Sequence, residues 1–301
     1  MMRCWISLLA ILSVLLSACD SKPEAQRQQP VVVYAVDTVA ASLPELFRAF
    51  TADTGIAVTV RHGNAQALVN DVIANRGSPA ADVLLTTNIA DTWRAADKGA
   101  LRPIQAAHLQ TVPAVLKDPD GLWAALDYRL AVIATHPEPG ILRPVAYTDL
   151  AGAQYHGKVC MVSSRLAISR SLLAMLIAEL GSRPAERVVR GWLHNLALPP
   201  FDTEQKLLLA IKSGVCEYGM LSDSIVDADV DTIVPQPVYI DIDGIGIARH
   251  ARHPEAAQRL LEWMLAMHAP ALQMYSNERN IGIAGWRDED AVSLAERVGY
   301  E

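Results

Sequence analysis

The side chains best suited to hold a ligand stand in short polar stretches that follow apolar runs of the sequence. They are carboxylates, hydroxyls, amides, an imidazole and two guanidinium groups, which bind either metal ions or anions. In chain order they are Asp37, Thr38, His62, Asn64, Thr87, Asn88, Asp127, Arg129, Ser163, Ser164, Arg165, Asp202, Ser222 and Asp223. Each is a candidate ligand contact, and the elements around it must decide whether it reaches a common site.

A metal ion is one ligand that these residues would suit. Asp37, His62 and Asp223 supply carboxylate and imidazole donors, with Asp202 as a further carboxylate. Oxygen and nitrogen donors of this kind fit several metals. The alternative is structural, because aspartate favours helix starts and turns. We favour a helix cap for Asp202, whereas ligand contact and simple solvation are equally open for His62 and Asp223.

An anion is the other ligand that these residues would suit. Serine and threonine hydroxyls and the N–H groups at helix starts bind phosphate, phosphonate or carboxylate oxygens. The guanidinium groups of Arg129 and Arg165 can grip the same oxygens with two parallel hydrogen bonds. For Arg129 the alternative is a salt bridge within the fold, with Asp127 as a candidate partner, and we favour the ligand role.

The first part of the body predicts strands and helices in alternation. Apolar strand signals lie at 31–36, 56–60 and 82–85. Helical patterns follow each of them, and two of these patterns begin directly after asparagines that suit a helix start, Asn64 and Asn88. This order is typical of a doubly wound α/β sheet.

The alternation restarts after residue 129. Strands are expected at 158–162 and 215–221, with helices between them, and a long strand signal covers 238–248. The fold class is therefore α/β with two doubly wound units. Ligands of open α/β sheets bind beyond the carboxyl ends of the strands, so two facing units would place the candidate residues around a cleft.

The N-terminal residues predict export and attachment to a membrane through lipid alone. Residues 1–18 have a short basic start and an apolar run of the length found in secretory signal peptides. Leu16–Cys19 reads Leu-Ser-Ala-Cys and looks like a bacterial lipobox, so we expect lipid on Cys19; an ordinary signal peptide with a chance cysteine is the alternative. Asp20 resembles a signal for retention at the inner membrane, and residues 19–30 read as a flexible tether.

Two cysteines remain in the body, Cys160 and Cys216. They fall on strands that we expect to be neighbours, in an export compartment that permits disulfides. A disulfide forms if their Cα atoms come within about 7 Å of each other. Two buried free thiols are the alternative, because cysteine also serves as a small apolar residue.

Composition and motifs exclude other classes of protein. The chain of 301 residues carries a net charge of −7, which does not suit a nucleic-acid binder. Only the N-terminus has a long apolar run, which argues against a protein that crosses a membrane many times. The sequence contains no G-x-S-x-G, P-loop or H-E-x-x-H motif, so we predict that it is not an enzyme.

An ordered set of segments carries a family resemblance. It comprises VVVYAVDT, FRAFTADTGIAVTVRHGN, SPAADVLLT, DKGALRPI, WAALDYRLAVIAT, FDTEQKLLLAIKSGVCEYGML and IDGIGIARHARHPEAAQRLLEWML. Together they cover most of residues 31–285 and are similar, in this order, to bacterial periplasmic solute-binding proteins of ABC transporters. The resemblance is to the ferric-iron-binding branch of the two-lobed type II fold.

The resemblance implies two lobes, each a doubly wound mixed sheet, that close over a ligand and deliver it to an ABC permease. Residues 31–128 plus 239–301 would form lobe 1, and residues 129–238 would form lobe 2. The ligand would be ferric iron or another metal with a synergistic anion, a metal complex, or a small oxyanion. Arg129 matches the arginine with which the family binds the anion beside the metal. We expect a periplasmic monomer.

The sequence departs from the family at two places. The family has two adjacent tyrosines after the strand aligned with 215–221, where this chain reads Ser222-Asp223-Ser224-Ile225. A second arginine, expected two residues after Arg129, is Ala131. The phenolates that suit bare ferric iron are therefore absent from that stretch. The alternative function is a carrier or sensor lipoprotein that hands an organic solute (a phosphonate, a carboxylate or an apolar molecule) to a non-ABC partner.

Overall fold

The computed structural model describes residues 29–36, 43–77, 80–137, 140–272 and 281–301. The predicted signal peptide, the lipidation site Cys19 and the candidate ligands Asp37 and Thr38 lie outside the described residues. No described helix combines the length and the apolar character needed to cross a bilayer.

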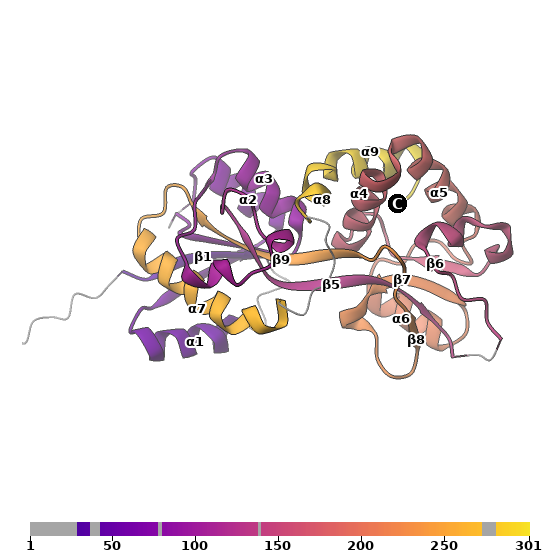
Figure 1. Cartoon of the computed structure of the whole chain (residues 1–301), viewed down its shortest axis with the longest axis horizontal. Helices are drawn as coiled ribbons and strands as arrows, with labels where there is room; N and C mark the ends of the chain where they lie inside the picture. Colours follow the sequence, from indigo (N-terminus) through magenta and orange to yellow (C-terminus); the bar gives the residue numbers. More distant parts are fainter. Residues whose placement is uncertain (1–28, 37–42, 78–79, 138–139, 273–280) are drawn as a thin grey trace, which may run out of the picture.

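The first half of the molecule is a mixed sheet with helices on both faces (Figure 1). Its elements are β1 (Val31–Val36), α1 (Leu43–Thr54), β2 (Val58–Gly63), α2 (Ala65–Ile73), β3 (Val83–Thr86), α3 (Ile89–Asp97), β4 (Leu101–Arg102) and α7 (Pro254–Leu272). β1 pairs in parallel with both β2 and β3, and all of its side chains are buried. α1 and α7 cover one face of the sheet, and α2 and α3 cover the other.

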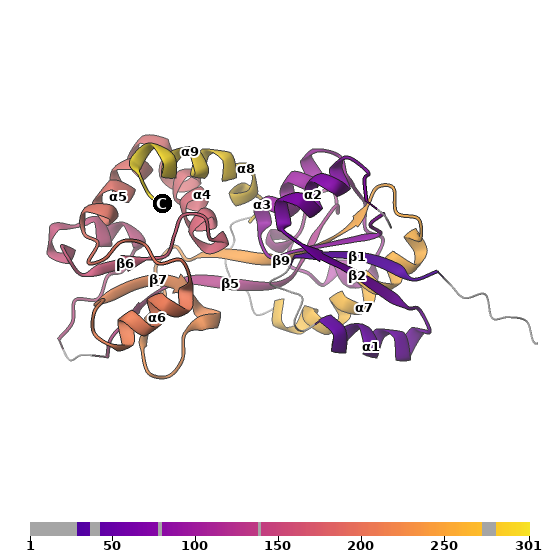
Figure 2. The same cartoon turned by 180° about the vertical axis from the view of Figure 1, so that it is seen from behind.

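The second half repeats this arrangement around a smaller group of strands (Figure 2). Its elements are β6 (Val159–Met161), α4 (Ala167–Leu180), α5 (Ser182–His194), α6 (Glu204–Lys212), β7 (Tyr218–Ser222), β8 (Asp231–Ile233) and α9 (Asp288–Val298). α4, α5 and α9 lie on one face of these strands and α6 lies on the other. α4 is buried along most of its length because it lies between the strands and the other two helices.

Two long strands, β5 (Ala124–Thr135) and β9 (Tyr239–Ala248), run through both halves and pair with each other in antiparallel fashion. The sequence has two apolar runs here, residues 123–126 and 130–134, separated by the polar residues 127–129. The structure makes one strand of them, with a register shift between Ala125 and Asp127. The break is polar because this part of β5 passes between the halves, where no helix of either half covers it fully.

The mixed α/β fold predicted from the sequence is confirmed, with two halves joined by the crossing strands β5 and β9. The hydrogen-bonded strand order is β2-β1-β3-β9-β5-β7-β6, so pairing continues from one half into the other through β9 and β5.

The C-terminal segment was expected in the first half, as part of residues 239–301. α9 instead packs against α4 and α5 of the second half, and the short α8 (Gly282–Trp286) packs against both α3 and α4. α9 has a stripe of buried apolar residues, and α4 offers the apolar surface that covers it.

Cys160 and Cys216 form a disulfide, with their Cα atoms 5.8 Å apart. Cys160 lies on β6, and Cys216 lies just before β7, which pairs with β6 in parallel. Of the two alternatives that the sequence left open, the structure thus has the disulfide.

Loss of this disulfide should destabilise the protein. A bridge that closes a loop over 56 residues of sequence separation is expected to contribute about 4 kcal/mol to the free energy of unfolding, because it restricts the unfolded chain. Urea denaturation of the double variant Cys160→Ala/Cys216→Ala should show this loss, and reduced wild-type protein should match it. A wild-type protein with the same midpoint before and after reduction would contradict the bridge.

Candidate functional site

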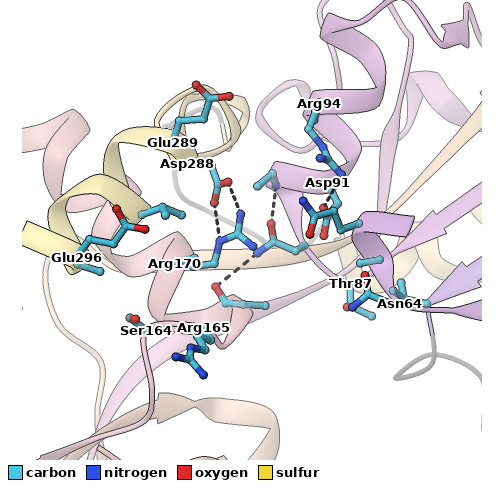
Figure 3. A pocket seen from close by; sticks show the side chains of 18 of the residues that line it. Asn64, Thr87, Asp91, Arg94, Ser164, Arg165, Arg170, Asp288, Glu289 and Glu296 are labelled. Carbon is cyan, nitrogen blue, oxygen red and sulfur yellow. Dashed lines mark hydrogen bonds and ion pairs between the residues drawn. The ribbon is translucent and has the colours of Figure 1, made fainter. Parts of the chain in front are cut away.

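A cleft of about 980 Å³ lies between the two halves (Figure 3). The first half contributes the ends of β1 and β2, the start of α2, and the segment from β3 into α3. The second half contributes the loop between β6 and α4, the first turn of α4, and one side of α9. The cleft therefore occupies the carboxyl ends of strands from both halves, where the sequence predicted a ligand.

Three helices begin at the cleft. Asn64 caps α2 by accepting a hydrogen bond from the backbone N–H of Ala67 at 3.3 Å. Asn88 caps α3 in the same way, with the N–H of Ala90 at 2.7 Å. α4 begins at Ala167 with no side-chain cap. The partial positive charge of each helix start favours an anion in the cleft.

Five of the predicted ligand residues line this cleft. They are Asn64, Thr87, Asn88, Ser164 and Arg165. Arg165 is exposed, and no partner for its guanidinium group is found within the described part of the chain. It is therefore the predicted residue best placed to meet a negatively charged ligand.

The remaining described candidates lie elsewhere. His62 is an exposed residue of β2, and Ser163 accepts a hydrogen bond from the N–H of Arg165 at 3.2 Å. Asp202 pairs with Lys206 at 2.7 Å beside the start of α6, where Thr203 is the cap. The sequence thus placed Asp202 at the correct helix start but one residue from the cap.

Residues 222–224, which stand where the family has its tyrosine pair, form hydrogen bonds within the fold. The buried hydroxyl of Ser222 lies 3.0 Å from that of Ser224. Asp223 accepts a hydrogen bond from the N–H of Leu130 at 2.8 Å, which fastens this loop to β5. Within the described ranges, no group of three or more His, Cys, Asp or Glu side chains is arranged to hold a metal ion. The proposed ligand Asp37 lies outside those ranges.

Charged side chains that the sequence analysis missed form the inner wall of the cleft. Arg170 of α4 donates two hydrogen bonds to Asp288 of α9, and Figure 3 shows the two groups directed at each other. Across the cleft, Arg94 lies 3.7 Å from Asp91 on α3. Burial raises the pKa of Asp91, although the charges of Arg170 and Arg94 oppose this. Arg170 has a signal in the sequence, because it is a charged residue near the start of a mostly apolar helix.

Arg129 does not line the cleft but binds acidic groups of the fold. Its guanidinium donates to Asp243 at 2.6 Å and to the carbonyl of Thr87 at 2.8 Å, and it lies 3.8 Å from Asp241. Burial lowers the pKa of Arg129, yet the charges of Asp243 and Asp241 outweigh burial and raise it. The salt bridge that the sequence analysis kept as an alternative is present, with partners other than Asp127.

Asp241 of β9 is the fully buried member of this group. One of its oxygens accepts the N–H groups of Ile89, at 3.1 Å, and Ile242, at 2.9 Å. The other accepts the side-chain amide of Asn88 at 3.1 Å. Burial raises the pKa of Asp241 to about 6, although Arg129 and these hydrogen bonds favour the ionised form. Nothing in the sequence distinguishes this aspartate, which lies inside an apolar strand.

Comparison with known proteins identifies one family for this chain. The family described as bacterial extracellular solute-binding protein matches residues 31–273. The iron uptake protein A1 of Synechocystis sp. is 28% identical over an alignment that covers 91% of this chain and 83% of that protein.

Two solved structures share the fold, each with a TM-score of 0.79. One is a Trichodesmium protein in complex with iron and citrate ligands, at 24% identity over 90% of this chain and 100% of that chain. The other is the ferric binding protein from Campylobacter jejuni, at 22% identity and the same coverage. At these identities the likeness establishes the fold alone.

The buried carboxylate should make stability depend on pH. The folded state holds the Asp241 proton more tightly than the unfolded chain does, because the pKa rises from 3.8 to about 6 on folding. The stability due to Asp241 is therefore complete below its usual pKa and is lost as pH rises through the folded pKa. Relative to Asp241→Asn, the free energy of unfolding should fall by about 1.4 kcal/mol per pH unit from about pH 4 to about pH 6.

Urea denaturation at a series of pH values measures this slope. The exposed Asp120 supplies the control, since Asp120→Asn should leave the wild-type profile unchanged. A constant difference between wild type and Asp241→Asn across this pH range would rule out a titrating Asp241.

Proposed function

The chain belongs to the bacterial extracellular solute-binding proteins, and on that premise we propose that it captures a small anionic solute for an ABC permease. The observation that carries this proposal is the cleft between the halves, at which α2, α3 and α4 all begin. A solute that touches both walls stabilises the closed arrangement through its additional contacts there. Closure would present the permease with a surface that the open form lacks.

We propose ferric iron, carried as an anionic chelate, as the solute. One relative is named an iron uptake protein and another, from Serratia marcescens, an Fe(3+)-binding periplasmic protein, and these names support iron. Ser222 and Asp223 form hydrogen bonds within the fold, and the described residues hold no cluster of three or more His, Cys, Asp or Glu side chains for bare iron. A carboxylate chelator such as citrate would supply the oxygen donors, and its charge would meet Arg165 and the helix starts.

A second candidate is a metal-free oxyanion, phosphonate or carboxylate. The three helix starts and Arg165 favour it as strongly as they favour a chelate, since both ligands present oxygens with negative charge. A sensor that passes such a solute to a non-ABC partner would use the same cleft.

The division into lobes is also a proposal. The first lobe would hold residues 31–128 and 239–272, and the second would hold residues 129–238 and 288–301. The packing of α9 on α4 and α5 supports the transfer of the C-terminal residues to the second lobe. In this scheme the protein acts as a monomer, because both walls of the cleft come from one chain.

The site of action would be the periplasm, with the protein held at the inner membrane by lipid on Cys19. The polar residues that follow Cys19 would let the folded body reach a permease in the same membrane.

Ligand preference can be measured by calorimetric titration of the full-length protein in detergent with ferric citrate, citrate and inorganic phosphate. Ferric citrate should bind saturably, and Arg165→Ala should weaken it at least ~10-fold by removing a charge-assisted hydrogen bond. Arg183, an exposed arginine of α5 outside the cleft, supplies the matched control, and Arg183→Ala should bind as wild type does.

Tighter binding of citrate or phosphate than of ferric citrate would support the metal-free candidate instead. If none of the three binds, and no metal or small molecule copurifies by elemental analysis and native mass spectrometry, the solute-receptor proposal fails.

Lipid attachment has a direct test in cell fractionation. Cys19→Ala should move the protein from the membrane fraction to the soluble fraction, because the thiol that accepts lipid is gone. Cys4→Ala, which alters the other N-terminal cysteine, should leave the protein with the membranes. Membrane attachment of Cys19→Ala would contradict the anchor.

A further inference from the structure

Asn88 joins the two halves of the molecule by direct hydrogen bonds. Its side-chain nitrogen lies 3.2 Å from the hydroxyl of Ser171 and 3.4 Å from the carbonyl of Ala167, both on α4 of the second half. The same nitrogen lies 3.1 Å from Asp241 on the crossing strand β9. The amide has two hydrogens, and three acceptors share them: two on α4 and one on β9.

Water is nearly excluded from this contact. Asn88 and Ser171 are each 3% exposed, and Asp241 is 1% exposed. A buried polar group that loses its partner forfeits the hydrogen bond and cannot replace it with solvent. Movement of α4 away from α3 at this point would cost the Asn88 amide its two acceptors on α4 and the Ser171 hydroxyl its partner, so the two helices should move here as one body.

The packing around α8 also restricts movement between α3 and α4. α8 contacts both α3 and α4, and Gly285 of α8 lies directly against Trp93 of α3. A Cβ atom at Gly285 would come within 2.4 Å of the Trp93 side chain, so the backbone of α8 approaches α3 as closely as a glycine permits. The boundary between α3 and α4 thus has a polar contact at Asn88 and a tightly packed contact with α8 at Gly285.

We infer that Asn88 is a positioning residue, which fixes α4 to α3 at the pivot about which the cleft opens and closes. The sequence suggested Asn88 as a ligand contact. Its amide hydrogens are shared by Ser171, Ala167 and Asp241, and its oxygen caps α3 at Ala90, so its polar atoms serve the fold. That the cleft opens and closes rests on the proposed function. The hydrogen bonds between Asn88 and α4 do not depend on that function.

Asp241 also helps to hold α3 in place at this pivot. It accepts both the first N–H of α3, from Ile89, and the amide of Asn88, and so holds the start of α3 on the crossing strand. Arg129 on β5 pairs with Asp243 and with the carbonyl of Thr87, which joins the second crossing strand to the same corner. The pivot therefore lies where both crossing strands meet α3 and α4.

The test measures the distance between the halves without ligand. Spin labels attached through a ketone-bearing amino acid at the exposed positions Asn70 on α2 and Arg187 on α5 leave the cysteines unaltered. Pulsed electron paramagnetic resonance on the full-length protein in detergent then gives the distribution of distances. Ser171→Ala should widen or shift this distribution, and Asn88→Ala should do so more strongly, because it removes all three contacts.

Ser169 supplies the matched control. It is also a serine of α4 that is 3% exposed, but its hydroxyl lies 3.1 Å from Tyr300 and 3.4 Å from the carbonyl of Val162, neither of which is in the first half. Ser169→Ala should lower the melting temperature about as much as Ser171→Ala and leave the distance distribution as in wild type.

The inference is overturned if Ser171→Ala and Asn88→Ala, both folded by circular dichroism, give the same distribution as Ser169→Ala. Because no ligand is added, this result is separate from the calorimetric outcome. A protein that binds none of the tested solutes can still show the pivot, and a protein that binds ferric citrate can lack it.

Discussion

A buried carboxylate on a crossing strand organises the centre of this molecule. Asp241 would be costly to keep charged in this place without donors, and it receives three hydrogen bonds and a nearby guanidinium group. Apart from Ile242 on the same strand, these groups belong to elements that must be placed correctly for a cleft to exist: α3 through Ile89, its capping residue Asn88, and β5 through Arg129. The need to satisfy one carboxylate therefore fixes the relative positions of these elements.

The cleft that results has walls of different character. The starts of α2, α3 and α4 give it a positive field, and Arg165 adds an exposed positive charge to its lining. The charges deeper in the cleft are already paired, Arg170 with Asp288 and Arg94 near Asp91. Anions should therefore be favoured near the helix starts, while the pair of Arg170 and Asp288 fastens the C-terminal helix α9 to α4.

The local sequence predicted much of the architecture because periodicity and capping act over a few residues. The strand at 31–36 and the caps Asn64 and Asn88 have the predicted places, since a buried central strand and an asparagine at a helix start need only their own neighbours. The sequence pattern divides β5 in two because its residues 127–129 are polar, and the structure leaves them only partly buried where the strand passes between the halves. The position of α9 depends on which apolar surface is left uncovered, and that follows from the whole fold.

By itself, the sequence determined the α/β class, the family resemblance, the pair of cysteines in the body of the chain, and the loops that contain candidate ligand residues. Tertiary structure decided which candidates share a site. It placed Thr87, Ser164 and Arg165 at the cleft, engaged Arg129, Ser222 and Asp223 within the fold, and brought Arg170 and Asp288 together. The reason is that hydrogen bonding and charge pairing join residues far apart in the chain, and a pattern of neighbouring residues does not encode those distances.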